Sequence, residues 1–185
     1  MVNSLMKLRE IILSDEILIA PGAHDALSAK IVEIMGFKLV YMTGFGVSAS
    51  MNGMPDVGLT SFEEMLWMLR RIVNAVNIPV IADADTGYGN AINVIRTVKE
   101  YMRAGAAGLH IEDQVFPKRC GHVEGKEVIP CEEMVGKILA AIDTRNSLNR
   151  DFLIIARTDA LNVEGLEKTL ERLDLYAEAG ADMLF

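Results

Sequence analysis

Short apolar runs alternate with longer amphipathic stretches along almost the whole chain, and this alternation limits the folds available to it. The apolar runs are rich in Ile, Val and Leu and lack polar alternation, as strands buried on both faces of a parallel sheet do. They are Ile17–Ala20, Leu39–Met42, Pro79–Asp83, Gly108–Glu112, Leu153–Arg157 and Asp182–Phe185. Between and before them, apolar residues at helical spacing predict helices over residues 3–14, 24–35, 61–76, 91–104, 130–147 and 165–179.

The repeated strand–helix unit predicts an α/β protein. Six strands could form a doubly wound sheet, but the unit spacing and the polar residues at the strand ends favour a (β/α)8 barrel of the TIM type, typically of about 250 residues. On this interpretation residues 1–185 are the N-terminal portion of a single barrel domain with an extra N-terminal helix. The barrel would be truncated after about strand six, which leaves an unpaired edge strand.

Charge and composition narrow the range of partners. The chain has 18 Lys and Arg against 26 Asp and Glu, a net charge of −8 that repels nucleic acid and anionic lipid. No apolar run approaches the ~18 residues that a spanning helix needs. The two cysteines, Cys120 and Cys131, form neither a disulfide framework nor a CxxC motif. We therefore expect reduced thiols, a cytoplasmic location, and neither nucleic acid nor membrane as a partner.

Charged residues follow three of the predicted strands at the point where each ends. Asp83 and Asp85 follow the third strand, Glu112 the fourth and Arg157 the fifth. In parallel α/β proteins, catalytic groups gather at these carboxyl ends. Acidic residues at one mouth indicate a divalent cation, and Mg²⁺ suits them because it keeps waters and takes only one or two protein carboxylates. The alternative is that Asp83 and Asp85 accept loop amides or pair with Arg157.

A second cluster, Lys118-Arg119-Cys120-Gly121-His122, lies in the loop after the fourth strand. A thiol flanked by Lys, Arg and His lies in a positive field, which favours the thiolate. Gly121 permits backbone conformations that a moving loop needs. The alternative is a solvated basic loop whose cysteine only packs.

Two further features are weaker signals. Residues 41–49 after the second strand form a predicted Gly-rich loop, whose backbone amides could approach an anion. This loop matches neither GxGxxG nor the P-loop, so nucleotide binding is not indicated. His110, within the fourth strand, is expected in the barrel wall rather than among metal ligands.

Together these stretches resemble the isocitrate lyase/phosphoenolpyruvate mutase superfamily. The Lys-Arg-Cys-Gly-His stretch is close to the KKCGH signature of its lyase branch, and the other matches occur in family order across nearly the whole chain. Those matches are Pro21–Ala26, Asp83–Gly89, Glu112–Gln114 and Ala156–Ala160. Within the superfamily the chain is most similar to the 2-methylisocitrate lyase branch, which includes 2,3-dimethylmalate lyases.

The resemblance implies a metal, a gate and a pocket. The metal would be Mg²⁺, with Mn²⁺ as an alternative, held by Asp83, Asp85 and Glu112. The mobile gate would consist of Lys118, Cys120, Gly121 and His122, and Cys120 would deliver the proton. The implied substrate-binding residues are Thr43, Gly44, Phe45, Asp56, Gly121 and Arg157. Arg157 would also act in catalysis by pairing with a substrate oxygen or carboxylate.

The implied reaction cleaves a carbon–carbon bond of a 2-methylisocitrate-type hydroxy di- or tricarboxylate into a 2-oxo acid such as pyruvate and a succinate-type acid. A phosphonomutase, a phosphonopyruvate-handling enzyme or an oxaloacetate decarboxylase are alternatives within the superfamily, but those members generally lack the cysteine of this loop. An inactive barrel fragment is an alternative of another class. Phe45 stands where methylisocitrate lyases often have glycine, which leaves the alkyl substituents open. The resemblance also implies a homo-oligomer, usually a tetramer.

Overall fold

Six parallel strands form one sheet in the computed structural model, which describes residues 8–13 and 17–185. Each strand pairs with the next one along the chain, in the order β1-β2-β3-β4-β5-β6. Their bounds are β1 Gly22–Ala23, β2 Val40–Met42, β3 Val80–Asp83, β4 Gly108–Glu112, β5 Leu153–Arg157 and β6 Met183–Leu184. A doubly wound sheet would reverse its strand order at a switch point. The unbroken order is that of a barrel wall, as predicted.

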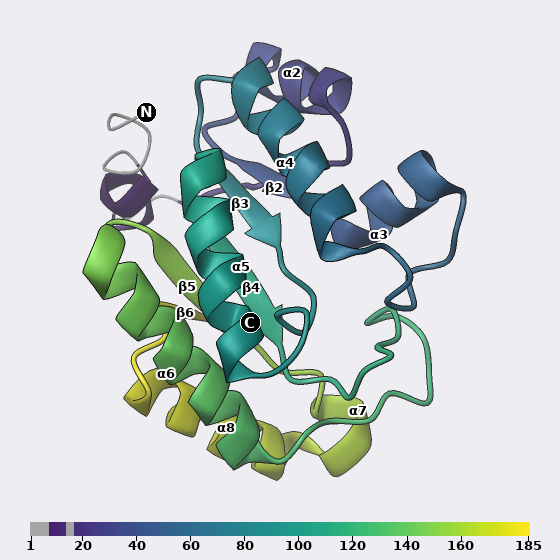
Figure 1. Ribbon diagram of the computed structural model, residues 1–185, viewed down its shortest axis with the longest axis vertical. Helices are drawn as coiled ribbons and strands as arrows, with labels where there is room; N and C mark the ends of the chain where they lie inside the picture. The colour runs from purple at the N-terminus through teal and green to yellow at the C-terminus, as the bar shows by residue number, and fades with distance from the viewer. Residues whose placement is uncertain (1–7, 14–16) are drawn as a thin grey trace.

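The longer helices follow one another in the same order as the strands and cover one face of the sheet (Figure 1). Neighbours along the chain contact each other, α2 with α4, α4 with α5, α5 with α6, and α6 with α8. The helix bounds are α2 Ala26–Ile34, α4 Phe62–Ala75, α5 Ala91–Ala104, α6 Cys131–Leu148, α7 Leu161–Glu164 and α8 Leu166–Glu178. All five predicted helices after residue 20 are therefore present, and no end differs from its predicted position by more than two residues.

Local sequence sets where several helices begin. The Ser61 side chain accepts a hydrogen bond from the backbone of Glu64, and the Glu64 side chain accepts one from the backbone of Ser61, which forms a capping box at α4. Asp25 with Ser28 forms the same arrangement at α2. These caps satisfy amide groups that a helix leaves unpaired at its first turn.

Apolar side chains pack on both faces of the sheet. The larger cluster lies between strands and helices and includes the fully buried Tyr101 and Phe152. The smaller cluster lies on the other face and includes Leu39, Ile81 and Leu153. This burial on two faces explains why the strand sequences are continuously apolar.

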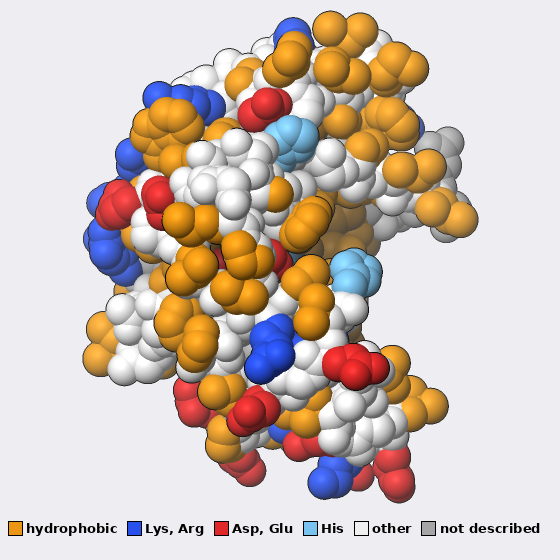
Figure 2. All heavy atoms as spheres, turned by 90° about the vertical axis from the view of Figure 1, so that its right-hand side faces the viewer, with side chains coloured by type: hydrophobic (Ala, Val, Ile, Leu, Met, Phe, Trp, Pro, Cys, Tyr) orange, Lys and Arg blue, Asp and Glu red, His pale blue; other side chains and the backbone are white. Residues whose placement is uncertain are grey.

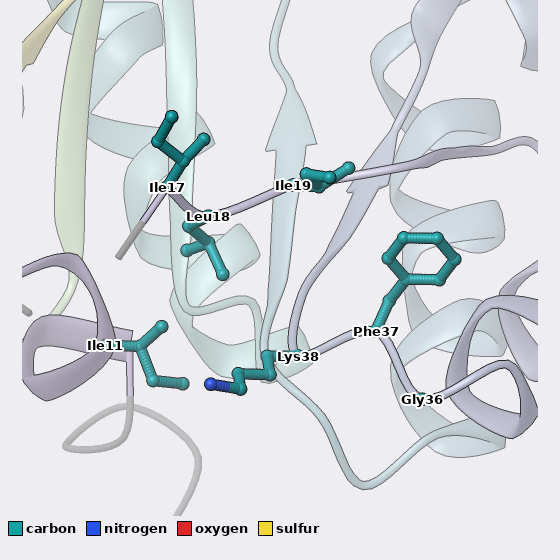
Figure 3. Close-up of a pocket in the computed structure, with 7 residues that line it drawn as sticks. All are labelled: Ile11, Ile17, Leu18, Ile19, Gly36, Phe37 and Lys38. Carbon is teal, nitrogen blue, oxygen red and sulfur yellow. The ribbon is translucent and has the colours of Figure 1, made fainter. Parts of the chain in front are cut away.

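The first strand lies later in the chain than predicted. The apolar pattern predicts a strand at residues 17–20, but β1 consists of Gly22 and Ala23, and Gly22 pairs with Tyr41. In this register residues 17–20 would face residues 36–39, where the chain is still turning and β2 has not begun. Ile17, Leu18 and Ile19 instead line a small hollow of about 180 Å³, together with residues 36–38, which precede β2 (Figure 3).

Two other segments differ from the predictions. The segment after β2 was predicted as a loop, but it forms the short helix α3, Gly44–Val47, followed by a π-helix, η1, Ser48–Asn52. The Thr43 side chain caps α3 by accepting a hydrogen bond from Gly46 N. Of the predicted N-terminal helix, residues 8–12 are helical, and residues 3–7 and 14 lie outside the described residues. In the described part of the chain, no helix is long and apolar enough to cross a membrane.

Candidate active site

A cavity of about 320 Å³ opens where the strands end, and most of the predicted site residues line it. Its lining comprises Tyr41, Thr43, Phe45, Asp56, Asp83, Glu112, Lys118, Cys120, Gly121, His122, Arg157 and Phe185. The other two predicted residues, Gly44 and Asp85, adjoin it because each donates its backbone N–H to Asp83. Figure 2 views the side on which α3 lies and shows apolar side chains gathered around a hollow.

Asp83 ends β3 and is held by two backbone amides and a tyrosine hydroxyl. Its Oδ2 accepts a hydrogen bond from Gly44 N at 3.0 Å, and its Oδ1 accepts one from Asp85 N at 2.9 Å. The Tyr41 hydroxyl lies 3.3 Å from Oδ2 and 2.7 Å from His110 Nε2. These are the amide contacts that the alternative interpretation of Asp83 predicted. A Cβ on residue 44 would lie 2.6 Å from Oδ2, so the close approach requires glycine.

Asp85 is buried beside Asp83 in an uncommon backbone conformation. Its φ is 46°, in the left-handed region that non-glycine residues rarely adopt. Burial and the negative charge of Asp83 raise the pKa of Asp85 to about 7, against the opposing effect of Lys118. Strained residues of this kind cluster at functional sites, where the surrounding fold holds them in place.

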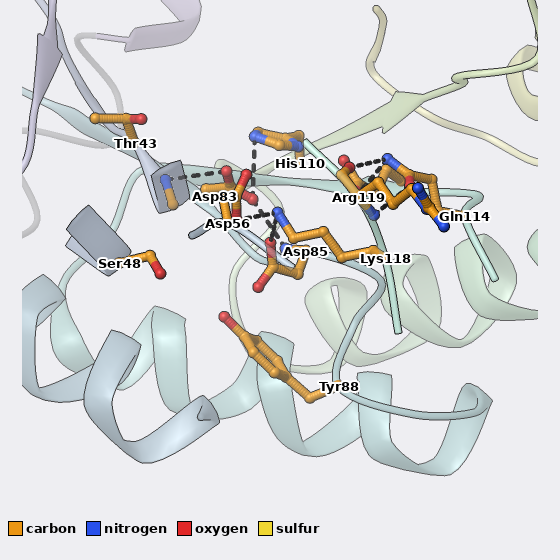
Figure 4. Close-up of polar contacts among 12 residues, drawn as sticks. Thr43, Ser48, Asp56, Asp83, Asp85, Tyr88, His110, Gln114, Lys118 and Arg119 are labelled. Atoms are coloured by element: carbon orange, nitrogen blue, oxygen red, sulfur yellow. Dashed lines mark hydrogen bonds and ion pairs between the residues drawn. The ribbon is translucent and has the colours of Figure 1, made fainter. Parts of the chain in front are cut away.

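Lys118 reaches from the loop into this carboxylate cluster (Figure 4). Its Nζ lies 2.5 Å from Asp56 Oδ1 and 2.8 Å from Asp85 Oδ1, and the residue is only 3% exposed. Burial alone would lower the pKa of Lys118, but Asp85 and Asp83 outweigh it and raise that pKa, so the ammonium stays charged. The alternative of a solvated basic loop is therefore wrong for Lys118, although Arg119 and His122 are exposed. Cys120 is half-buried between them.

Arg157 ends β5 and bridges two carboxylates. Its Nη1 lies 3.3 Å from Glu112 Oε2, and its Nη2 lies 3.3 Å from Asp159 Oδ2. Glu112 is 1% exposed, and burial raises its pKa well above the ordinary value despite the opposing charge of Arg157. The expected alternative pairing of Arg157 with Asp83 or Asp85 is not the one formed.

The donor set fits Mg²⁺ with water completing its shell. Among residues 8–13 and 17–185, no three or more His, Cys, Asp or Glu side chains form a group that could hold a metal ion. Mg²⁺ does not need such a cage, because it is bound through one or two carboxylates and retains several waters. The buried carboxylates of Asp83, Asp85 and Glu112 are hard oxygen donors whose negative charge a cation would offset.

Several neighbours of the site lie outside the residues predicted from the sequence. Tyr41 and Phe185 line the cavity, and Gln114 donates a hydrogen bond to Glu112, which also lines it. Gln114 belongs to the Glu112–Gln114 stretch, which matches the superfamily, but the match assigns no function to Gln114 itself. His110 lies in the wall as predicted, but it also lies 3.5 Å from Asp83 through its Nε2. Nothing in the sequence around Tyr41 indicates its contact with Asp83.

Gly121→Ala is expected to reduce turnover about tenfold or more, because a Cβ on residue 121 would collide with the Arg157 guanidinium, so that either the loop or the guanidinium that pairs with Glu112 and Asp159 must shift. Gly136→Ala is the matched control. Residue 136 lies within α6 with open space around it, so this change should stabilise the helix by ~0.5–1 kcal/mol and leave turnover unchanged. Steady-state kinetics and thermal unfolding of both variants test this. Equal turnover in the two variants would contradict the close packing of the loop on Arg157.

An open-sided wall of parallel strands, with carboxylates at the strand ends and a cysteine loop beside them, defines an α/β-barrel type of enzyme site. Residues 8–185 match the family model described as phosphoenolpyruvate phosphomutase. The chain belongs to this family, within the phosphoenolpyruvate mutase/isocitrate lyase superfamily.

Two curated relatives are similar over nearly the whole chain. The 2,3-dimethylmalate lyase of Eubacterium barkeri is 54% identical over 184 residues, which are 100% of this chain and 63% of the relative. The 2-methylisocitrate lyase of Aeropyrum pernix is 51% identical over 96% of this chain and 56% of the relative. The chain thus spans less than two thirds of the length of each.

Solved structures extend the range of activities among similar proteins. Oxaloacetate acetylhydrolase with the inhibitor 3,3-difluorooxalacetate has a TM-score of 0.95 and 44% identity, covering 98% of this chain and 62% of that one. Phosphonopyruvate hydrolase with oxalate and Mg²⁺ has a TM-score of 0.89 and 40% identity, with the same coverage. Family membership therefore establishes the fold and leaves the substrate to be decided from the site.

Proposed function

We propose that the protein is a Mg²⁺-dependent carbon–carbon lyase, which cleaves a 2-methylisocitrate-type hydroxy di- or tricarboxylate into a 2-oxo acid and a succinate-type acid. The observation that carries this proposal is a cysteine on the same cavity wall as Lys118, Arg157, a histidine and a group of buried carboxylates. A lyase of this kind needs an acid for the carbon that loses its bond and positive charge for the developing anion.

The metal would be held by Asp83, Asp85 and Glu112, and when bound it would supply Lewis-acid polarisation of the substrate hydroxyl and the new carbonyl. Asp83 and Asp85 are locked by Gly44 N, Tyr41 and Lys118, which gives them one orientation. Thr43, Gly44 and Phe45 would face the carboxylate of the 2-oxo acid half, and Arg157 would pair with a substrate oxygen or carboxylate. Asp56 would contact the substrate from the other side of Lys118.

The reaction balances with groups on this wall. The substrate hydroxyl gives its proton to a site carboxylate, the C2–C3 bond breaks, and its electron pair stays on C3, beside the C3 carboxylate. C2 becomes the carbonyl of the 2-oxo acid. Cys120 then donates its thiol proton to C3, while Lys118 and His122 provide the positive surroundings. Closure of the loop would exclude water from the anion before that proton arrives.

A substrate panel tests this proposal. Purified protein with Mg²⁺ is given 2-methylisocitrate, 2,3-dimethylmalate, oxaloacetate or phosphonopyruvate, each alone, and pyruvate is followed with coupled lactate dehydrogenase. We expect turnover of a methylated hydroxy acid, and its loss when EDTA removes the metal. Phosphate assays run in parallel, because phosphonopyruvate hydrolysis also yields pyruvate. Turnover of phosphonopyruvate without turnover of either hydroxy acid would reject the lyase. The expected homo-oligomer, a tetramer, stays a prediction.

A further inference from the structure

The loop that carries Cys120 is closed at its base by backbone pairing and is held internally by hydrogen bonds from one of its own side chains. Gln114 and Val128 form an antiparallel bridge, and Val115 N donates to Glu127 O at 2.8 Å. Lys126, itself 8% exposed, donates its Nζ protons to the carbonyls of Gly121 and Val123. Residues 115–127 therefore form a hairpin-like loop, referred to below as the cysteine loop, with a fixed base.

The Gln114 side chain, 1% exposed, reaches from that base to the middle of the cysteine loop (Figure 4). Its Oε1 accepts a hydrogen bond from Arg119 N, and its Nε2 donates one to Arg119 O, both at 2.9 Å. The side-chain amide thus pairs with the backbone of Arg119 as one strand residue pairs with another. A primary amide can do this because it carries a donor and an acceptor together. Arg119 stands between Lys118 and Cys120, so these contacts fix the backbone that presents both side chains.

The same amide also faces the site. Gln114 Nε2 lies 3.1 Å from Glu112 Oε1 and 2.9 Å from Asp159 Oδ2. Those two carboxylates are the partners of Arg157, on its two terminal nitrogens. Two buried carboxylates near one another repel, and a donor between them offsets that repulsion together with the guanidinium. Gln114 consequently links the backbone of the cysteine loop by hydrogen bonds to the Glu112–Arg157–Asp159 group, which Gly121 of the same loop also approaches closely.

We propose that Gln114 is a positioning residue that sets where Lys118 and Cys120 stand relative to Glu112 and Arg157. It touches no substrate in this role and acts through the backbone of Arg119. The proposed effect of Gln114 on the positions of Lys118 and Cys120 rests on its contacts alone. The effect of those positions on catalysis rests on the proposed lyase function. A glutamate of equal size cannot replace the amide, because it lacks the donors and would put a third carboxylate beside Glu112 and Asp159.

The test reads the loop without any substrate. Full-length protein is treated with iodoacetamide, and the alkylation rates of Cys120 and Cys131 are measured separately by peptide mass spectrometry. In Gln114→Met, Cys120 should react about tenfold faster, the equivalent of one net hydrogen bond lost from the cysteine loop. Cys131, at the start of α6, should stay within about twofold, as expected of a site that shares no partner with the change.

Two further variants keep the test decisive. Gln114→Glu retains the acceptor for Arg119 N but loses the donors, so Cys120 should again react faster while Cys131 does not. Thr144→Val removes a buried hydroxyl bonded to Ala140 O in α6 and controls for general loss of stability. Unchanged Cys120 reactivity in either folded Gln114 variant, or equal acceleration of both cysteines, would overturn the proposal. Failure of wild-type protein on the substrate panel would reject the lyase and leave this result standing.

Discussion

Cys120→Ser should reduce turnover of the preferred hydroxy acid by about 10²- to 10⁴-fold, the range that a positioned acid contributes. Serine nearly preserves the shape, but its hydroxyl is a far weaker acid than a thiol. The bond-breaking groups and the carboxylate cluster stay in place, because Asp83 and Asp85 are held by Gly44, Tyr41 and Lys118 and not by the cysteine. Mg²⁺ affinity measured by calorimetry should therefore be unchanged.

Cys131→Ser is the matched control for this variant. Cys131 is the other free cysteine, half-buried at the first position of α6 and outside the cavity lining. Its replacement should leave turnover within about twofold, as for an ordinary change away from the site. Equal losses in the two serine variants, or full activity of Cys120→Ser, would remove Cys120 from the acid role.

Asp113→Ala should lower the free energy of unfolding by about 3–5 kcal/mol, the usual cost of breaking a buried charged network from one side. Asp113 is fully buried and accepts from four groups that belong to two later segments. The Thr158 and Tyr176 hydroxyls each lie 2.7 Å from its Oδ2, Asp159 N lies 3.0 Å from its Oδ1, and Arg172 Nη1 lies 3.3 Å from Oδ2. All four donors would lose this acceptor.

Tyr176→Phe provides the comparison, because it removes one donor to Asp113 and keeps the ring. It should cost only ~1–2 kcal/mol. Urea denaturation of both variants, extrapolated to water, measures the two losses. A loss below about 1 kcal/mol in Asp113→Ala would show that these contacts do not anchor the segment after β5.

Much of the fold could be predicted because the pattern is local. Five strands and five helices followed from apolar spacing, and their order along the sheet followed from the repeated unit. The first strand was misplaced because strand pairing depends on the partner, and residues 17–20 have only a turn to face. The helix α3 was not predicted because Thr43, which caps it, lies in a glycine-rich stretch, and such a stretch is typical of a loop.

The residues of the candidate site could be predicted from the sequence, but the contacts between them could not. Motifs named Asp83, Asp85, Lys118 and Arg157, and the structure brings these strand ends and the loop to one cavity. The sequence contains no sign that Lys118 would be buried between Asp56 and Asp85, because that depends on how the cysteine loop folds back. Gln114 lies within the Glu112–Gln114 motif, yet its role depends on tertiary contacts with Arg119 and Asp159.

In the proposed reaction this site breaks a carbon–carbon bond and protonates the carbon released. The most direct measurement is turnover of 2,3-dimethylmalate or 2-methylisocitrate in D₂O, with both products analysed by mass spectrometry. Because a thiol exchanges its proton with solvent, the account predicts one deuterium per turnover, at the carbon next to the carboxylate of the non-oxo acid product. Two results would contradict this proposal. One is release of pyruvate together with a non-oxo acid that carries no deuterium next to its carboxylate, and the other is no cleavage of either hydroxy acid.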